Sequence, residues 1–188
     1  MKSVMGIINL QEKDDLIKEM AENRPIGSIP FAGRYRIIDF ALSSMVNSGI
    51  GHVGIMLPDK ARSVLDHLRS GKDWDLARRH EGLFYLPAVK EDATNRAGDL
   101  KNFYHNIDFV EHSEQKYVLL ASGNFVYNMD FTNALRFHQN TGADITMVYS
   151  IAPAEEEGEG VILETADNGL VEDIAQKPAV YEGSQVSM

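Results

Sequence analysis

Short apolar segments alternate with segments of helical periodicity along most of this 188-residue chain, and that alternation restricts the fold more than any other feature. Runs of β-branched and other apolar residues predict strands, and apolar residues recurring every three or four positions predict helices. The predicted strands are residues 4–10, 52–57, 83–86, 117–121, 144–152, 161–163 and 170–174. The predicted helices are residues 14–23, 38–49, 59–71, 100–110 and 131–142. This order predicts an α/β fold, with a mostly parallel sheet and helices on both of its faces.

Two segments refine that expectation. Tyr117–Ala121 is fully apolar, which is typical of the buried strands of a parallel sheet. Asn168-Gly169 lies between two apolar segments and predicts a β-hairpin. Ligands of parallel sheets bind beyond the carboxyl ends of the strands. The loops to consider for a site therefore follow Leu10, Leu57, Leu86 and Ala121.

Composition excludes several classes of function. The chain has no cysteine, which rules out a disulfide scaffold, a thiolate zinc site and a cysteine nucleophile. Its formal net charge is −10, so neither nucleic acid nor an anionic membrane is an expected partner. No apolar run approaches the roughly 20 residues that span a bilayer, and the first residues show no signal-peptide cleavage site. We expect a cytoplasmic protein.

The loop after the first predicted strand is a poor phosphate cradle. A cradle needs bare backbone N–H groups and a positive field. Asn9–Asp15 contains no glycine and three acidic residues, and no Walker or GxGxxG motif follows any predicted strand. The residues themselves therefore predict weak binding of a nucleoside triphosphate at this loop.

Other chemical signals have competing interpretations. The six histidines are scattered and predict no metal site, and Ser122 follows a buried strand without an identifiable partner for nucleophilic catalysis. Arg24, Arg34 and Arg36 cluster in a Pro/Gly-rich loop. Planar guanidinium groups suit phosphate recognition, but the same arginines could belong to a solvated loop and pair with carboxylates such as Asp39.

A long segment of the chain has a specific match. Arg24–Ile50, which reads RPIGSIPFAGRYRIIDFALSSMVNSGI, resembles the signature of glucose-1-phosphate adenylyltransferases, also called ADP-glucose pyrophosphorylases. Further matching segments follow in the family's order: His52–Ile55, Leu86–Ala88, Tyr104–Asp108, Tyr127–Asp130 and Lys177-Pro178. The resemblance covers essentially the whole chain.

This resemblance implies a Rossmann-like nucleotidyltransferase domain over residues 1–188, truncated at its C-terminal end. In the family a left-handed β-helix domain follows, which is absent from this chain. The family converts ATP and glucose 1-phosphate to ADP-glucose and pyrophosphate with Mg²⁺, for glycogen or starch synthesis. Its members are tetramers regulated by phosphorylated metabolites.

Several positions that serve catalysis in the family hold other residue types here. The family's glycine-rich phosphate loop falls on Gln11–Leu16, its lysine on Ile26, its metal-binding aspartate on Asn124 and its adenine-reading glutamine on Val89. Only Gly98 remains of a further nucleotide-pocket segment. Ile26 cannot neutralise a phosphate, and asparagine is a weaker Mg²⁺ ligand than aspartate.

Other positions keep the family's residue type. Lys177 matches the lysine that contacts the sugar phosphate, and Arg24 and Arg36 match arginines near the effector site. The resemblance is therefore greatest to GlgD-type subunits, the non-catalytic or regulatory partners of a catalytic subunit in some bacteria. We expect a regulatory, catalytically deficient subunit in a hetero-oligomer, a tetramer by analogy, that binds phosphorylated effectors and holds no Mg²⁺ of its own.

Two alternatives remain open. The chain could be an active sugar-phosphate nucleotidyltransferase that takes Mg²⁺ from another carboxylate, such as Asp130 or Asp99. It could also be an unrelated α/β binding protein.

Overall fold

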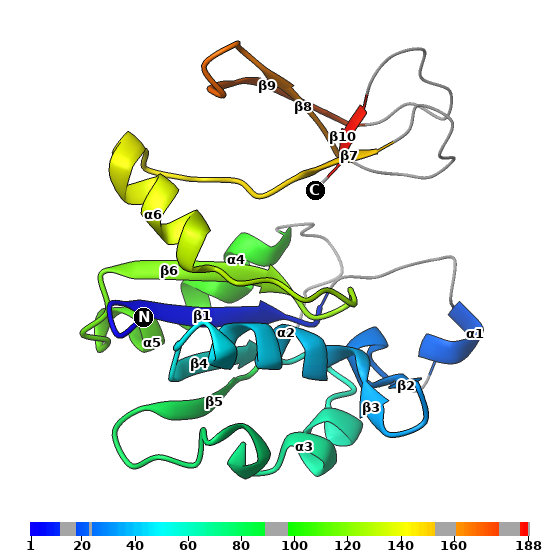
Figure 1. Cartoon of the computed structure of the whole chain (residues 1–188). Helices are drawn as coiled ribbons and strands as arrows, with labels where there is room; N and C mark the ends of the chain where they lie inside the picture. Colours follow the sequence, from blue (N-terminus) through cyan, green and yellow to red (C-terminus); the bar gives the residue numbers. More distant parts are fainter. Residues whose placement is uncertain (12–17, 23, 89–97, 153–160, 177–184, 188) are drawn as a thin grey trace. The chain divides into compact units, whose positions relative to one another are not determined.

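A computed structural model describes residues 1–11, 18–22, 24–88, 98–152, 161–176 and 185–187 of the chain (Figure 1). Its contacts divide the chain into two compact units, Met1–Thr132 and Asn133–Met188. Each unit is described by itself, and the prediction of one domain over residues 1–188 stays a prediction. No helix among the described residues is long and apolar enough to cross a membrane.

The first unit contains a four-stranded sheet in the order β5–β4–β1–β6. Its strands are β1 (Val4–Asn9), β4 (His52–Met56), β5 (Gly82–Leu86) and β6 (Tyr117–Ser122). All three neighbouring pairs are parallel. The register aligns Asn9 with Met56 and with Ser122, and Met56 with Leu86, so the four strands end together at one edge of the sheet. The parallel sheet predicted from the sequence is confirmed.

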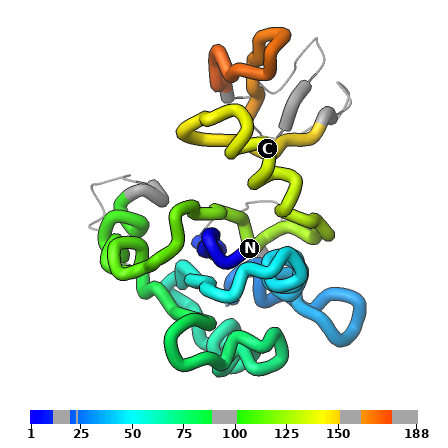
Figure 2. The backbone as a smooth tube through the Cα atoms, turned by 60° about the vertical axis from the view of Figure 1, so that its left-hand side comes forward, coloured from blue at the N-terminus to red at the C-terminus, as the bar shows by residue number. Residues whose placement is uncertain are grey.

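Helices cover both faces of this sheet. Helix α2 (Ile37–Asn47) lies on one face, and α4 (Gly98–His105) and α5 (Ile107–Glu111) lie on the other, as a second direction of view also shows (Figure 2). Glycines in the strands permit this close packing. A Cβ atom on Gly6 would lie 2.5 Å from the sulfur of Met45 in α2, so a larger residue there would require the Met45 side chain to shift.

On the α4–α5 face, Ile7, Met56 and Leu86 form a buried cluster against which Phe103, Phe109 and Val110 pack. Within the stripe predicted over residues 100–110, Phe103 and Val110 therefore face the core, whereas Tyr104 is 78% exposed. Its helix is interrupted, because the Asn106 side chain donates hydrogen bonds to the carbonyls of Asn102 (2.8 Å) and Pro87 (3.2 Å). An asparagine that bonds locally to backbone competes with the helix, which explains the break between α4 and α5.

Short elements connect the strands of this unit. They are α1 (Lys18–Ala21), the 3₁₀ turn η2 (Ile26–Ser28), β2 (Pro30–Phe31), β3 (Tyr35–Arg36), α3 (Arg62–Leu68) and the 3₁₀ turn η3 (Lys72–Trp74). Strands β2 and β3 form a small hairpin within the segment predicted as an irregular loop. Its turn uses Ala32 and Gly33, both at positive φ. Of the helix predicted over 14–23, residues 14–17 and 23 lie outside the described part.

The second unit contains most of α6 (Thr132–Thr141) and an antiparallel sheet in the order β7–β10–β8–β9. Its strands are β7 (Ser150–Ala152), β8 (Val161–Thr165), β9 (Val171–Gln176) and β10 (Gln185–Ser187). The hairpin predicted at Asn168-Gly169 is confirmed: β8 and β9 pair antiparallel, and Gly169 adopts the positive φ of 81° that such a turn requires.

Two strand predictions are wrong in part. Residues 144–149 form no strand, and only β7 remains of the strand predicted over 144–152, because no described strand of this unit pairs with those residues. Strand β6 is not fully buried, since it lies at the edge of the described sheet; Val118 is 40% and Leu120 63% exposed. The acidic loop predicted at 155–159 lies outside the described residues.

Candidate ligand site at the carboxyl edge of the sheet

The edge where the four strands of the first unit end is the expected ligand edge of a parallel sheet. Here the chain leaves β1 at Leu10, β4 at Leu57, β5 at Pro87 and β6 at Gly123. A nucleotide at such an edge is held mainly by backbone N–H groups that have no partner within the protein. The hydrogen bonds of these first residues therefore decide what the edge can bind.

Backbone N–H groups at the ends of β1 and β6 already donate within the protein. The N–H of Gln11 donates to Oδ1 of Asn9 at 3.0 Å, and the N–H of Leu10 donates to the carbonyl of Met56 at 3.2 Å. The N–H of Gly123 donates to the carbonyl of Asn9 at 2.8 Å. The Asn9 side chain thus forms an Asx turn that takes the donor a phosphate would need. These amides do not form a phosphate cradle.

The Gln11 side chain spans the same edge. Its Nε2 donates to the carbonyl of Leu57 at 2.9 Å, and its Oε1 accepts from Nδ2 of Asn102 at 2.6 Å. One carboxamide therefore joins the ends of β1 and β4 to helix α4. No local pattern predicts this bridge, since the two side chains are separated by 91 positions.

Leu10 fills the space between β1, the η2 turn and β6. Its side chain is 2% exposed, and its Cδ2 lies 2.5 Å from where a Cβ atom on Gly27 would be. The same Cβ atom would lie 2.8 Å from the carbonyl oxygen of Gly123. The η2 turn therefore packs directly against the end of β6, with the apolar side chain of Leu10 beside both.

Ile26, which stands where the family has a lysine, lies in η2 and is 6% exposed. It is packed as a core residue. The sequence expectation that this position supplies no positive charge agrees with that placement, since an aliphatic side chain buried here cannot meet a phosphate.

The loop after β6 carries Asn124 and Asp130. Asn124 is partly buried, and Asp130 is exposed and accepts a hydrogen bond of 2.9 Å from the N–H of Thr132. Among the described residues no three His, Asp or Glu side chains gather as a metal site would require. The neutral Asn124 at the end of β6 does not supply the carboxylate that Mg²⁺ prefers, and the expectation that this chain holds no Mg²⁺ of its own stays a prediction.

Two buried serines of α2 hold this loop, and sequence reasoning missed both. Ser44 Oγ accepts from the N–H of Met129 at 3.2 Å, and Ser48 Oγ accepts from the N–H of Phe131 at 2.9 Å. Tyr127 precedes Met129 in the same loop. Burial raises its pKa to about 12, and its hydroxyl has no hydrogen-bond partner among the described residues. Tyr127 is therefore a neutral phenol at physiological pH.

The two arginines predicted as effector ligands differ in their surroundings. Arg24 is exposed just before η2. Arg36 donates from Nη1 to the carbonyl of Ser63 at 2.7 Å, and from its backbone N–H to Oδ2 of Asp39 at 2.9 Å. Asp39 Oδ1 lies 2.6 Å from Nε2 of His67. Both guanidinium groups are donors only, so a shared anion rather than a direct bond would join them, and their assignment as effector ligands stays a prediction.

The remaining predicted site residues carry little structural information. Lys177 and Val89 lie outside the described residues. Gly98 is the first residue of α4. Asp99, an alternative Mg²⁺ ligand, lies in the same first turn.

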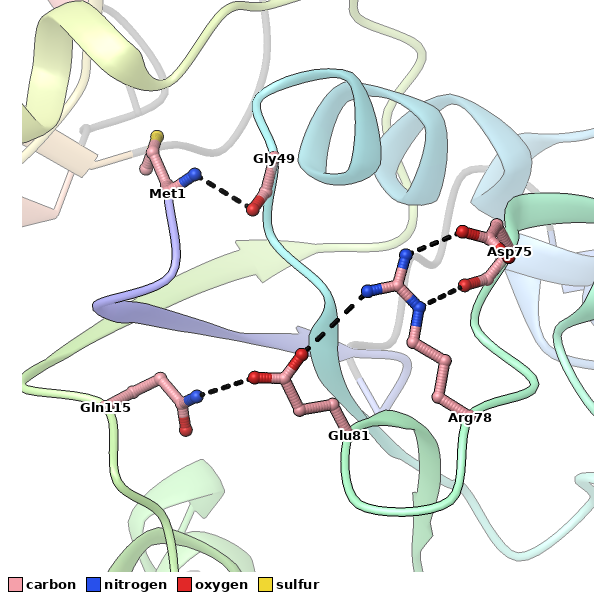
Figure 3. A network of polar contacts seen from close by, with 6 residues as sticks. All are labelled: Met1, Gly49, Asp75, Arg78, Glu81 and Gln115. Carbon is pink, nitrogen blue, oxygen red and sulfur yellow. Dashed lines mark hydrogen bonds and ion pairs between the residues drawn. The ribbon is translucent and has the colours of Figure 1, made fainter.

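A cavity of about 130 Å³ lies at the opposite, amino edge of the sheet. Its charged and amide lining side chains include Lys2, Arg78, Glu81 and Gln115. Arg78 Nη2 donates to Oδ2 of Asp75 at 2.6 Å, its Nη1 lies 3.9 Å from Oε2 of Glu81, and Gln115 Nε2 donates to Oε1 of Glu81 at 3.5 Å (Figure 3). The polar groups of Arg78, Glu81 and Gln115 therefore serve as ion-pair and hydrogen-bond partners for one another, which is a structural role within the fold.

His52 lies at the start of β4 near this edge. Its ring stacks on Phe109, with centroids 4.7 Å apart and planes 5° from parallel, and meets Phe84 at 5.0 Å. Burial lowers the pKa of His52 below its usual 6.5, and the negative charge of Glu81 opposes that shift. His52 is therefore a neutral, packed ring at pH 7.

The chain matches one protein family and is similar to several curated proteins. Residues 20–188 match the model of a protein family described as "Nucleotidyl transferase". The chain is 42% identical over 147 residues to "Glycogen biosynthesis protein GlgD" of Geobacillus stearothermophilus, which covers 77% of this chain and 43% of that protein. It is 37% identical over 147 residues to the protein of the same name from Bacillus subtilis, covering 78% and 43%.

A third relative carries an enzyme's name. The chain is 33% identical, over 189 aligned positions, to "Glucose-1-phosphate adenylyltransferase" of Mycoplasma mobile, which covers 100% of this chain and 50% of that protein. The chain thus spans about half the length of the curated relatives it matches.

Proposed function

We propose, from the premise that this chain belongs to the nucleotidyl transferase family, that it is part of a subunit of ADP-glucose pyrophosphorylase with a regulatory rather than a catalytic role. The names of its relatives support a place in glycogen biosynthesis, since two are glycogen biosynthesis proteins and a third is a glucose-1-phosphate adenylyltransferase. The cytoplasm is the compartment that this role requires.

The backbone donors already used at the end of β1, together with the buried Ile26, are the observation that supports the regulatory role. Adenylyl transfer needs donors and cations that stabilise the negative charge developing on the phosphates. At the end of β1 the N–H groups of Leu10 and Gln11 donate to protein acceptors, and Ile26 is buried and uncharged. Losing one such stabilising donor costs about 10²–10³ in rate, so several losses in one pocket leave little turnover.

The individual residues take the following proposed roles. Ile26, Asn124 and Val89 are degenerate catalytic or nucleotide positions, and Gly98 is a remnant of the nucleotide pocket. Lys177 contacts a sugar phosphate.

Arg24 and Arg36 bind the phosphate of an effector. Arg36 then has to share or give up its 2.7 Å hydrogen bond to the Ser63 carbonyl. Mg²⁺ is held by the catalytic partner subunit in this proposal, within a hetero-oligomer, a tetramer by analogy with the family.

A second candidate is an active sugar-phosphate nucleotidyltransferase. The 33% identity to a named adenylyltransferase along the whole chain favours it. It requires that the edge opens and that another carboxylate, such as Asp130 or Asp99, holds Mg²⁺.

Pyrophosphate release distinguishes the two. The full-length protein is assayed with ATP, glucose 1-phosphate and Mg²⁺, alone and mixed with a catalytic subunit. We expect no turnover by the protein alone and a changed response of the catalytic subunit to phosphorylated effectors. Turnover by the protein alone supports the second candidate. Failure to associate with any catalytic subunit contradicts the regulatory role.

A further inference from the structure

The cavity at the amino edge of the parallel sheet has an apolar floor and a charged rim. Val4, Ile50 and Leu76 line it and are buried, whereas Lys2 is exposed and Glu81 partly exposed. All of its lining residues belong to the first unit. Its volume of about 130 Å³ is that of about four water molecules, at roughly 30 Å³ each. The cavity therefore has room for one small organic molecule.

Glu81 on this rim has unused capacity to accept hydrogen bonds. Arg78 is held by Asp75, donating from Nε to its carbonyl at 2.8 Å and from Nη2 to its carboxylate at 2.6 Å. The contacts of Glu81 are longer, at 3.9 Å from Arg78 and 3.5 Å from Gln115 (Figure 3). A carboxylate offers about four acceptor positions, and bonds to an ammonium group are shorter, about 2.7–2.9 Å. Glu81 can therefore accept from a cationic ligand beyond its structural role.

Lys2 supplies the opposite charge. Its ammonium group has three donors and forms no hydrogen bond or ion pair within the part of the chain that the structure describes. His52, which also lines the cavity, is neutral at pH 7 and adds no charge. The two lining groups with unused capacity are thus one cation and one carboxylate. A ligand with a single charge leaves one of them unmatched.

We propose that this cavity binds a small zwitterion, an α-amino acid with a short aliphatic side chain. The ligand's carboxylate accepts from Lys2, its ammonium group donates to Glu81, and its side chain packs on the apolar floor. This site goes beyond the proposed function and does not depend on it, because the cavity lies where the strands begin, at the edge opposite to the expected ligand edge of the sheet.

Four small probes test the chemistry of the ligand with the full-length protein, by ligand-observed NMR titration. L-Alanine carries both charges, propionate lacks the ammonium group, ethylamine lacks the carboxylate, and glycine lacks the methyl group. For L-alanine we expect a dissociation constant between about 0.1 and 5 mM, which suits a ligand of about six non-hydrogen atoms. Propionate and ethylamine should bind at least about fivefold more weakly. Glycine should bind about fourfold more weakly, as expected for one buried carbon fewer.

Two charge-removing variants locate the binding. Lys2→Gln and Glu81→Gln should each weaken L-alanine binding at least about fivefold. The residual binding of propionate should fall only in Lys2→Gln, and that of ethylamine only in Glu81→Gln. Lys116→Gln and Glu114→Gln are the matched controls, since both residues are exposed beside Gln115 and neither lines the cavity. Binding to the controls should equal binding to wild type.

Three results overturn the proposal. The first is the absence of L-alanine binding at about 20 mM, well above the expected dissociation constant. The second is binding of propionate or ethylamine as tight as that of L-alanine, because the cavity then recognises one charge and not a zwitterion. The third is unchanged L-alanine binding in Lys2→Gln and Glu81→Gln, because the amino acid then binds elsewhere on the protein.

Discussion

The buried hydroxyl of Ser48, near the end of α2, accepts a hydrogen bond of 2.9 Å from the backbone N–H of Phe131, 83 positions later in the chain. It also donates to the carbonyl of Ser44 at 2.7 Å. This serine therefore fixes the end of the loop that carries Asn124 and Asp130.

Replacing Ser48 with alanine leaves the buried N–H of Phe131 without an acceptor. An unsatisfied buried donor costs about 1–3 kcal/mol, so we expect Ser48→Ala to lower the free energy of unfolding by that amount in urea titrations. Ser43→Ala is a useful comparison, because Ser43 accepts only a long 3.3 Å bond from Trp74 Nε1. Equal losses in the two variants would contradict the role given to Ser48.

Tyr127 allows the converse experiment, in which a buried polar group without a hydrogen-bond partner is removed. Its buried hydroxyl has no partner in the described part of the chain, so Tyr127→Phe removes a desolvated polar group without breaking a hydrogen bond. We expect this variant to be as stable as wild type or more stable by about 1 kcal/mol in thermal unfolding. Tyr104→Phe, at a position 78% exposed, should change little. A clear loss of stability in Tyr127→Phe would show that the hydroxyl has a partner.

His52 predicts a pH dependence. Its pKa in the folded state lies below the usual 6.5 because the ring is buried against Phe84 and Phe109. The unfolded chain therefore takes up a proton first as pH falls. The stabilisation is fully present above about pH 6.5 and is lost as pH falls through the lower folded pKa.

We expect the free energy of unfolding of wild type to decrease between pH 7 and pH 5 more steeply than that of His52→Phe, which cannot titrate. His80→Gln serves as the control, since His80 is exposed. Parallel pH profiles for wild type and His52→Phe would contradict this assignment.

A substitution at Ile26 tests whether this position can hold the lysine that the resemblance to the family places there. The side chain is 6% exposed within η2, so a lysine ammonium there is buried or displaces the turn. Burying an unpaired charge costs several kcal/mol. We expect Ile26→Lys to destabilise the protein by about 3 kcal/mol or more in urea titrations, and Ile26→Met by less than about 1.5 kcal/mol. A stable Ile26→Lys protein would mean that this position opens to solvent.

The sequence predicted the scaffold of the first unit well, because strand and helix periodicity are local signals. Strands β1, β4, β5 and β6 and helix α2 lie where the apolar patterns place them. The exposure of Leu120 was not predictable, since a strand at the centre of a sheet and a strand at its edge can have the same apolar sequence pattern. The break at Asn106 depends on a carbonyl at Pro87, which no helical pattern reveals.

The candidate site was predictable only in what it lacks. The absence of glycine after β1 and the isoleucine at position 26 are visible in the sequence, and the structure places Leu10 and Ile26 in the core. The hydrogen bond between Gln11 and Asn102 could not be predicted from the sequence, because the two side chains meet only after the sheet and α4 have assembled. Long-range side-chain contacts of this kind carry no periodicity.

The central claim is that the carboxyl edge of the sheet does not accept a nucleoside triphosphate. Calorimetric titration of Mg²⁺-ATP into the full-length wild-type protein tests it most directly. The account predicts no binding below about 1 mM, a concentration that corresponds to only about 4 kcal/mol of binding free energy. A dissociation constant in the micromolar range that is lost when adenosine replaces ATP in the titration would contradict it.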